Sequence, residues 1–244
     1  MIPKKIHYCW FGGNAMPDSL KQYILTWKKL CPDYEIIQWD ESNFDILSND
    51  YVREAYENKK WAFVSDYVRL YAIFSQGGIY MDTDVEVIKP LDSFLHYRGF
   101  TGFETMENPL TGIIGAEKHN PLIKKALENY NHIRFVNKDG SLNLTTNIDY
   151  FREICVAEGY LMNGEYQCIN GFAIYPCEYF CPFDFLNRKF IITDNTYTIH
   201  HFAGSWIPKR KKIIGKAKEI VIKVVGENAT KKIATIKRKL EGKN

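Results

Sequence analysis

Residues 61–84, WAFVSDYVRLYAIFSQGGIYMDTD, constrain the fold more than any other stretch of this chain. The segment from Trp61 to Ser75 is apolar on nearly all sides, which predicts a helix buried against a second layer. Gly77 is a residue at which such a helix can end. The apolar run that follows, at 79–81, predicts a short buried strand. A helix joined to a buried strand through a glycine turn indicates a layered α/β domain.

Earlier segments extend this pattern. Residues 4–13 (KKIHYCWFGG) and 34–39 (YEIIQW) are typical of buried strands, and apolar residues recur at helical spacing over 19–30. This alternation of strands and helices predicts an α/β fold with a mostly parallel central sheet, whose ligands bind beyond the carboxyl ends of the strands.

The signals after residue 100 are weaker. They predict helices over 121–130 and 149–158, and a strand running into a glycine turn over 196–206 (TYTIHHFAGSW).

Two aspartates follow the strand at 79–81. Because side chains alternate along an extended segment, Asp82 and Asp84 share one side of it. Two like charges repel, so a cation is expected beside them, and a divalent metal is the simplest candidate. A DxD alone also fits a solvated turn, but its place at the binding edge of an α/β sheet favours a metal site.

Asp66 and Arg69 lie three residues apart and so on one face of the apolar helix. An unpaired charge there would be expensive. Two interpretations remain open. The two residues form an ion pair with each other, or they line one cleft together with Asp82 and Asp84.

Three blocks now carry a resemblance: W-x-x-x-SDxxR-x(7)-GGxYxDxD at 61–84, IHYCWFGG at 6–13 and HHFAGSW at 200–206. Together they resemble the DxD-containing sugar transferases of glycosyltransferase family 32, of capsular polysaccharide type. They are also similar to the glucosyltransferase domain of the large clostridial toxins. The resemblance implies a GT-A type nucleotide-sugar-binding fold over residues 1–206. It further implies metal-dependent transfer of a hexose from a nucleotide diphosphate sugar to a glycan acceptor, with retention of the anomeric configuration. A UDP-linked sugar is the expected donor.

The resemblance also implies site residues in all three blocks. The tryptophan block packs on the nucleotide base, the SDxxR block holds the donor sugar and phosphates, and the last block reaches the diphosphate. The implied donor-binding residues are Cys9, Trp10, Asp66, Arg69, Tyr80, Asp82, Ser205 and Trp206, and the implied catalytic residues are Asp82, Asp84 and Arg69.

Asp82, Asp84 and His201 are the expected metal ligands. His200 and His201 cannot both be ligands from one strand, because neighbours face opposite ways. His201 is preferred because its spacing to Gly204 resembles that in the related family 8 transferases; one core and one surface histidine is the alternative. Two carboxylates with an imidazole suit Mn²⁺, whereas a shell of oxygens alone suits Mg²⁺.

Charge divides the chain into an acidic body and a basic tail. Residues 207–244 carry 13 Lys or Arg and 3 Glu, a net charge of +10, which leaves 19 basic and 26 acidic residues, a net charge of −7, in 1–206. Apolar residues in the tail recur at helical spacing, so we expect a basic amphipathic helical tail. Such a tail fits an anionic membrane surface or packs on the acidic body. It contains no aromatic residue to stack on bases, which argues against nucleic acid.

These features predict a cytoplasmic enzyme, peripheral at the inner face of the cell membrane, that extends a lipid-linked glycan in capsular or surface polysaccharide synthesis. Two other functions are alternatives. A metal-dependent phosphohydrolase usually has Thr or Val where Glu86 stands. A non-catalytic nucleotide-sugar-binding, membrane-associated module would not need the intact set of Asp66, Arg69, Asp82 and Asp84.

Overall fold

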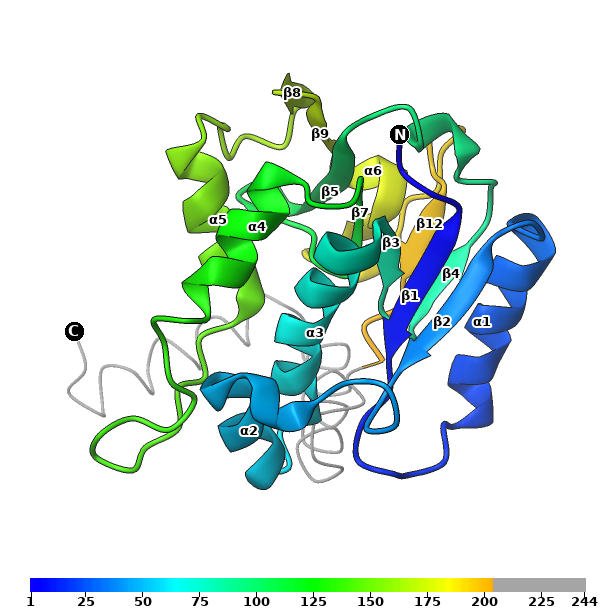
Figure 1. The fold of residues 1–244 in the computed structure, drawn as a ribbon. Coiled ribbons are helices and arrows are strands. Elements are labelled where there is room, and N and C mark those ends of the chain that lie inside the picture. Colours follow the sequence, from blue (N-terminus) through cyan, green and yellow to red (C-terminus); the bar gives the residue numbers. More distant parts are fainter. Residues whose placement is uncertain (204–244) are drawn as a thin grey trace, which may run out of the picture. The chain divides into compact units, whose positions relative to one another are not determined.

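An eight-stranded sheet forms the centre of the computed structural model, which describes residues 1–203 (Figure 1). Its strands lie in the order β2 (Glu35–Trp39), β1 (Lys5–Cys9), β3 (Gly78–Met81), β7 (Ile113–Ala116), β5 (Gly99–Thr105), β9 (Phe172–Tyr175) and β8 (Gln167–Ile169), with β6 (Asn108–Pro109) paired to β5.

The strand directions confirm a mostly parallel sheet, although the pairings are mixed. β1 runs parallel to β2 and β3, and β5 runs parallel to β9. β7 is antiparallel to both of its neighbours, β3 and β5, and β8 is antiparallel to β9. Because β7 reverses the direction between them, β3 and β5 point the same way. The carboxyl ends of β1, β3 and β5 therefore meet at one edge of the sheet.

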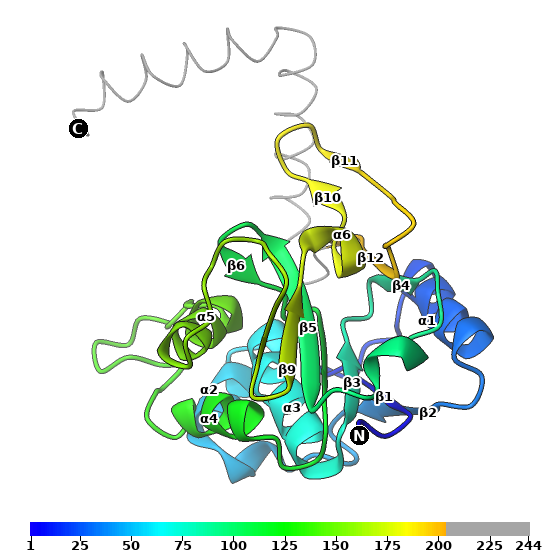
Figure 2. The same cartoon turned by 90° about the horizontal axis from the view of Figure 1, so that it is seen from above.

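Each face of the sheet has its own covering layer and its own apolar cluster (Figure 2). One face is covered by α2 (Asp50–Glu57), α3 (Trp61–Gln76), α4 (Pro121–Asn129) and α5 (Asn147–Ala157). The other carries α1 (Asp18–Leu30), α6 (Cys177–Phe180) and a two-stranded sheet of β4 (Val85–Val87) and β12 (Thr198–His200). Short elements complete the fold: η1 (Ile46–Ser48), η2 (Asp92–Phe94), β10 (Phe183–Asp184) and β11 (Lys189–Phe190).

The glycine pair sets the angle between α3 and β3. Gly77 ends the helix with φ 67°, and its N–H donates to the carbonyl of Ile73 at 2.7 Å. Gly78 has φ 118°, and a Cβ there would lie 2.8 Å from the carbonyl oxygen of Lys5 on β1. His7 secures the turn by donating from Nε2 to the Gly77 carbonyl at 2.8 Å. Both glycines are therefore required for β3 to pair with β1 and to present Asp82 at the edge.

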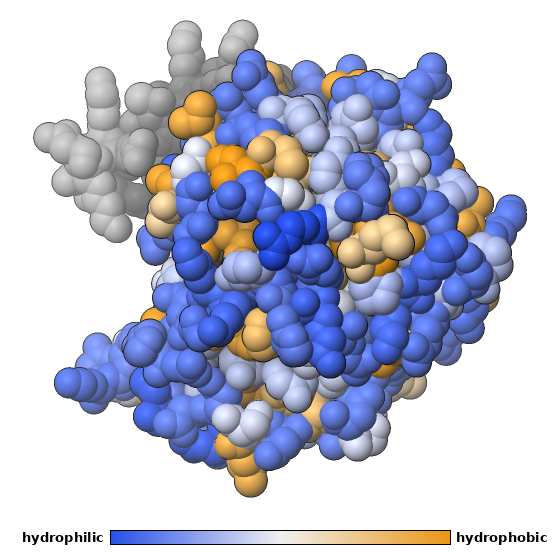
Figure 3. Space-filling view, turned by 45° about the horizontal axis from the view of Figure 1, so that its top comes forward, coloured by the Kyte–Doolittle hydropathy of each residue, from blue (hydrophilic) through white to orange (hydrophobic). Residues whose placement is uncertain are grey.

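The predicted helices at 19–30, 61–75, 121–130 and 149–158 are all found, within a few residues of the expected bounds. The strand expected at 196–206 begins as β12, whereas Ser205, Trp206 and the tail at 207–244 lie outside the described residues. Within the described part, no helix is long and apolar enough to cross a membrane. The face shown in Figure 3 is mostly hydrophilic, with apolar side chains in small separate patches.

Candidate active site

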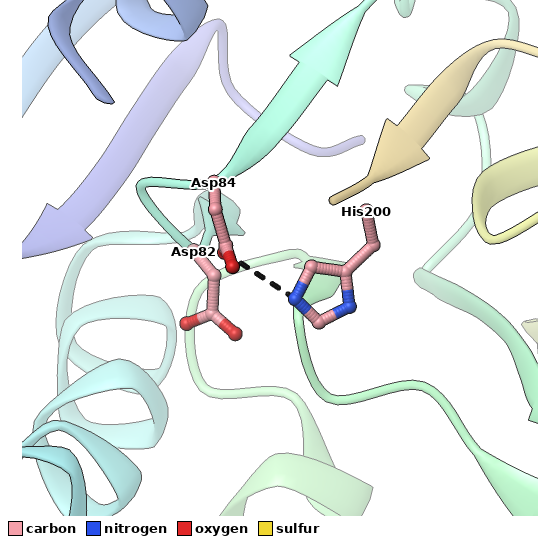
Figure 4. Close-up of side chains that lie close together, drawn as sticks. All are labelled: Asp82, Asp84 and His200. Carbon is pink, nitrogen blue, oxygen red and sulfur yellow. Dashed lines mark ion pairs between the residues drawn. The ribbon is translucent and has the colours of Figure 1, made fainter. Parts of the chain in front are cut away.

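Asp82, Asp84 and His200 come together beyond the end of β3 (Figure 4). The backbone N–H of Asp82 donates to the carbonyl of Gly112 at 2.8 Å, which fixes the turn after the strand. His200 ends β12, which pairs antiparallel with β4 so that His200 stands opposite Val85. This register brings His200 Nε2 to 3.3 Å from Asp84 Oδ1. One ligand atom from each of the three side chains lies within 4.8 Å of the others.

His201, the expected third ligand, lies outside this cluster. Its Nε2 is 2.8 Å from Glu86 Oε2, and its ring stacks on Tyr23 with 4.5 Å between centroids. In the structure only one of the two histidines faces the aspartates. The geometry favours His200 over the predicted His201, because the register of β12 on β4 places His200 beside Asp84, and spacing to Gly204 does not determine that register.

The chemistry of the cluster fits a divalent cation. His200 Nδ1 is buried and has no hydrogen-bond partner among the described residues. Burial lowers the pKa of His200, but the hydrogen bond and charge of Asp84 outweigh burial, so the pKa lies above its usual value. An excess of negative charge therefore surrounds the imidazole, as expected where a cation is to be held.

Gly112 keeps the space beside this cluster open. A Cβ at this position would lie 3.2 Å from Asp82 Oδ2 and 3.3 Å from His200 Nδ1. Among the described residues, neither Asp82 Oδ2 nor His200 Nδ1 has a hydrogen-bond partner. A side chain at position 112 would therefore crowd the two atoms that a metal would use. Sequence reasoning missed Gly112, because only its position beside two distant residues marks it as special.

Arg69 joins the cluster to α3 and is almost fully hydrogen-bonded. It is 5% exposed, and its Nη2 donates to Asp66 Oδ1 at 2.9 Å. Nη1 donates to the carbonyl of Thr111 at 2.8 Å and lies 3.4 Å from Asp82 Oδ1. The ion pair of the first interpretation is therefore present, and Arg69 also contacts Asp82 of the DxD.

Asp66 is buried beside this arginine. Burial raises its pKa to about 6, although the charge of Arg69 acts in the opposite direction. The backbone N–H of Asn147, at the start of α5, also donates to its carboxylate. Asn147 accepts a hydrogen bond from the Thr111 hydroxyl at 3.1 Å, so α5 and the loop before β7 belong to the same network. Thr111 was not named from the sequence, since it acts through its fold position.

Tyr80 lies behind the DxD and does not face outward. It is 1% exposed, its hydroxyl donates to Asp82 Oδ1 at 2.8 Å, and the Arg69 guanidinium lies 4.7 Å from its ring centroid. Tyr80 and Arg69 thus hold one oxygen of Asp82 and leave Oδ2 available.

The tryptophan block lies at the same edge, after β1. Cys9 is buried, and burial raises the pKa of its thiol, so it is neutral. Trp10 is half-buried, and its Nε1 donates to the carbonyl of Asn14 at 2.6 Å. A Cβ on Gly12 would lie 2.6 Å from the Trp61 ring, so a second indole lines this edge. Trp10 therefore retains an accessible surface for a base, whereas Cys9 is part of the apolar cluster on the α3 side of the sheet.

Residues 17–101 match the family model described as "Glycosyltransferase sugar-binding region containing DXD motif", and this range includes Asp66, Arg69 and the DxD. Over these residues the chain therefore carries the sugar-binding region of a glycosyltransferase, and it is an enzyme of that class. A relative of Acanthamoeba polyphaga mimivirus, "Uncharacterized glycosyltransferase L373", is 27% identical over 226 residues, 86% of each chain. The DXD motif of this glycosyltransferase thus lies at the carboxyl edge of the sheet, and the expected α/β fold with a mostly parallel central sheet is found.

Further likenesses cover less of the chain. "Inositol phosphoceramide mannosyltransferase 3" of Schizosaccharomyces pombe is 29% identical over 138 residues, 55% of this glycosyltransferase and 38% of the relative. The solved structure titled "PaToxG Glycosyltransferase" matches with a TM-score of 0.49 and 22% identity, over 65% of this chain and 70% of that one. This glycosyltransferase spans well under half the length of the S. pombe relative.

Proposed function

We propose that this glycosyltransferase transfers a hexose from a UDP-linked sugar to a glycan acceptor, and that the reaction requires a divalent metal. The observation that carries the proposal is the cluster of Asp82, Asp84 and His200 within the DXD region. Two carboxylates and an imidazole are a donor set suited to Mn²⁺, with Mg²⁺ as the alternative. Such an ion, when bound, neutralises the diphosphate that leaves as the sugar bond breaks.

The chain's own residues prepare this site before any ligand binds. Tyr80 and Arg69 hold Asp82 by one oxygen, and Asp84 holds His200 by Nε2. Metal binding needs a neutral imidazole, so a proton on His200 would leave when the ion enters. Trp10 is half-buried, and a nucleotide base would stack on the accessible part of its ring. The roles of Ser205 and Trp206 at the diphosphate, and retention of configuration, remain proposals from the family resemblance.

We further propose that the acceptor is lipid-linked and that the enzyme works at the inner face of the cell membrane in capsular or surface polysaccharide synthesis. The tail at 207–244 has a net charge of +10, and about 1 kcal/mol of attraction to an anionic leaflet is expected for each basic residue near it. The segment around β10 and β11 exposes Phe185, Leu186, Ile191 and Ile192 beside Arg188 and Lys189. The S. pombe relative is named for a lipid acceptor, inositol phosphoceramide.

The metal and donor are tested by a thermal-shift panel of UDP-, GDP- and CMP-sugars with and without Mn²⁺, followed by donor hydrolysis. A donor at 100 times its Kd stabilises the native state by about 2.7 kcal/mol. We expect a UDP-hexose to raise the melting temperature only with Mn²⁺, and Asp84→Asn to abolish both this shift and hydrolysis while remaining folded. Full turnover in excess chelator would contradict the metal requirement, and a shift with GDP-mannose alone would replace the UDP donor.

The hydrolysis assay also separates the proposed transferase from a phosphohydrolase. A phosphohydrolase would release inorganic phosphate from several phosphate esters.

The membrane proposal is tested by sedimentation with anionic liposomes at rising salt. We expect the full chain to sediment at low salt and a chain truncated after Trp206 to lose most of that binding. Salt should release the full chain, because the Debye screening length falls from about 10 Å at 0.1 M to about 3 Å at 1 M salt. Equal sedimentation of both chains would refute a membrane role for the tail.

A further inference from the structure

Glu104, near the end of β5, differs from the other acidic side chains at this edge of the sheet. Asp66, Asp82, Asp84 and Glu86 each have a hydrogen bond or ion pair with a nearby side chain. Within residues 1–203, Glu104 takes part in no hydrogen bond and no ion pair. It is nevertheless half-buried, so its carboxylate has lost part of its hydration without gaining a protein partner.

The position of Glu104 places it beside the metal-ligand candidates. Glu104 belongs to β5, whose carboxyl end lies at the same edge of the sheet as that of β3, and its register on β6 shifts between Phe103 and Thr105. α6 packs against both β5 and β12, the strand that ends in His200. The charges of His200 and Asp82 both act on Glu104, and the charge of Glu104 acts on the thiols of Cys177 and Cys181. Glu104 therefore lies close to the cluster of Asp82, Asp84 and His200.

An unpaired carboxylate in such a place is unfavourable for the protein alone. Burial raises the pKa of Glu104, and the charge of Asp82 adds to this effect while that of His200 opposes it. A buried acceptor without a donor destabilises the native state until a ligand supplies one. Ionisable side chains with shifted pKa values are common at functional sites, where a protein gives up some stability for function.

We propose that Glu104 accepts hydrogen bonds from hydroxyl groups of the sugar that binds beside Asp82, Asp84 and His200, and so selects that sugar. This inference rests on the proposed function. Both oxygens of an ionised carboxylate accept hydrogen bonds, and a pair of neighbouring hydroxyls on a sugar ring supplies two donors. Asp66 and Arg69 are already bonded to each other and to the backbone. Glu104 is therefore the carboxylate at this edge with acceptor capacity to offer.

The sugar in question is either the donor hexose or the acceptor, and kinetics of Glu104→Gln and Glu104→Ala in the full chain distinguish them. Loss of a hydrogen bond to a charged group corresponds to about 10- to 100-fold in affinity. If Glu104 binds the donor hexose, the KM for the UDP-sugar rises by this factor in hydrolysis without acceptor. If it binds the acceptor, only the acceptor KM in the transfer reaction rises.

Thermal unfolding separates this role from a structural one. Replacing an unpaired, half-buried carboxylate should leave the melting temperature of Glu104→Gln unchanged or raise it. Glu107→Ala is the matched control, since Glu107 is an exposed acidic residue on the turn that follows β5, and its replacement should change neither KM nor melting temperature.

Three results would overturn the inference. A fall in melting temperature with both KM values unchanged would make Glu104 a structural residue. Unchanged KM values at unchanged stability would also overturn it, while the proposed function would stand because the wild-type enzyme still turns over its donor. A wild-type chain that neither binds nor hydrolyses any nucleotide sugar would overturn the inference together with the proposed function.

Discussion

The two sides of Asp82 differ in how completely their polar groups are hydrogen-bonded. On the α3 side, which we call the closed side, Asp66, Arg69 and Tyr80 are buried and bonded to one another, to the backbone or to Asp82. On the β12 side, the open side, His200 has an unpartnered Nδ1 and Glu104 has no hydrogen bond within the described part of the chain.

This difference separates residues that hold the site from residues that can receive a ligand. Arg69 cannot turn to a substrate without breaking its hydrogen bonds to Asp66 and to the Thr111 carbonyl, which would cost several kcal/mol. The closed side therefore fixes the geometry of Asp82 in advance, as catalysis by electrostatic stabilisation requires. The open side has acceptor atoms that gain a partner only when metal or sugar binds.

The largest effect is expected on the closed side, from Arg69→Met. Removing one partner of a buried ion pair costs about 3 to 5 kcal/mol, because Asp66 and Asp82 would remain charged without a counter-ion. Urea unfolding measures this loss. Arg53→Met is the matched control, since Arg53 pairs with Asp50 and Glu57 on the surface of α2 and should cost at most about 1 kcal/mol. Equal unfolding midpoints for the two variants would show that the closed side is not a stabilising network.

The sequence predicted much of the framework of the closed side, because its signals are local. The apolar helix at 61–75, the glycine pair and the strand before Asp82 each follow from neighbouring residues, and β1 and β2 follow from short apolar runs. What could not be predicted is that Arg69 already has several hydrogen-bond partners within the protein. It depends on the Thr111 carbonyl, 42 residues further along the chain, which only the inserted strand β7 brings into reach.

The sequence missed the strands β5 and β7 for a related reason. Gly99 and Gly115 lower the strand propensity of these segments. In the structure, a Cβ on Gly99 would lie 2.2 Å from the Phe172 ring, and one on Gly115 would lie 2.2 Å from the Phe100 ring. The glycines are thus required by packing across the sheet, which no local pattern reveals. Gly112 lies just before β7, so its relation to the site was hidden as well.

The second effect is expected on the open side, from a comparison of His200→Ala with His201→Ala. Removing a residue that only hydrogen-bonds to a metal ligand lowers metal affinity about 10- to 100-fold. Removing the ligand His200 itself should therefore lower metal affinity by at least about 100-fold. His201 bonds to Glu86, so its removal should lower stability by about 1 kcal/mol and leave metal affinity nearly unchanged. Titration with Mn²⁺ measures both variants. A larger loss in His201→Ala would restore His201 as the ligand.

The smallest effect is expected from Gly112→Ala, which narrows the open side without removing any polar group. The added methyl would lie 3.2 Å from both Asp82 Oδ2 and His200 Cε1, so these atoms would have to shift by a few tenths of an ångström. Replacing glycine by alanine restricts the unfolded chain and stabilises by about 0.4 to 1 kcal/mol where the backbone allows it. This gain should offset most of the contact strain, so the melting temperature should change little. Mn²⁺ affinity should nevertheless fall about tenfold, in the range of other changes made behind metal ligands. UDP binding without metal serves as the internal control and should be unaffected. If Mn²⁺ affinity is unchanged in Gly112→Ala, the ion does not use Asp82 Oδ2 and His200 Nδ1 together, and the open side must hold it through other atoms.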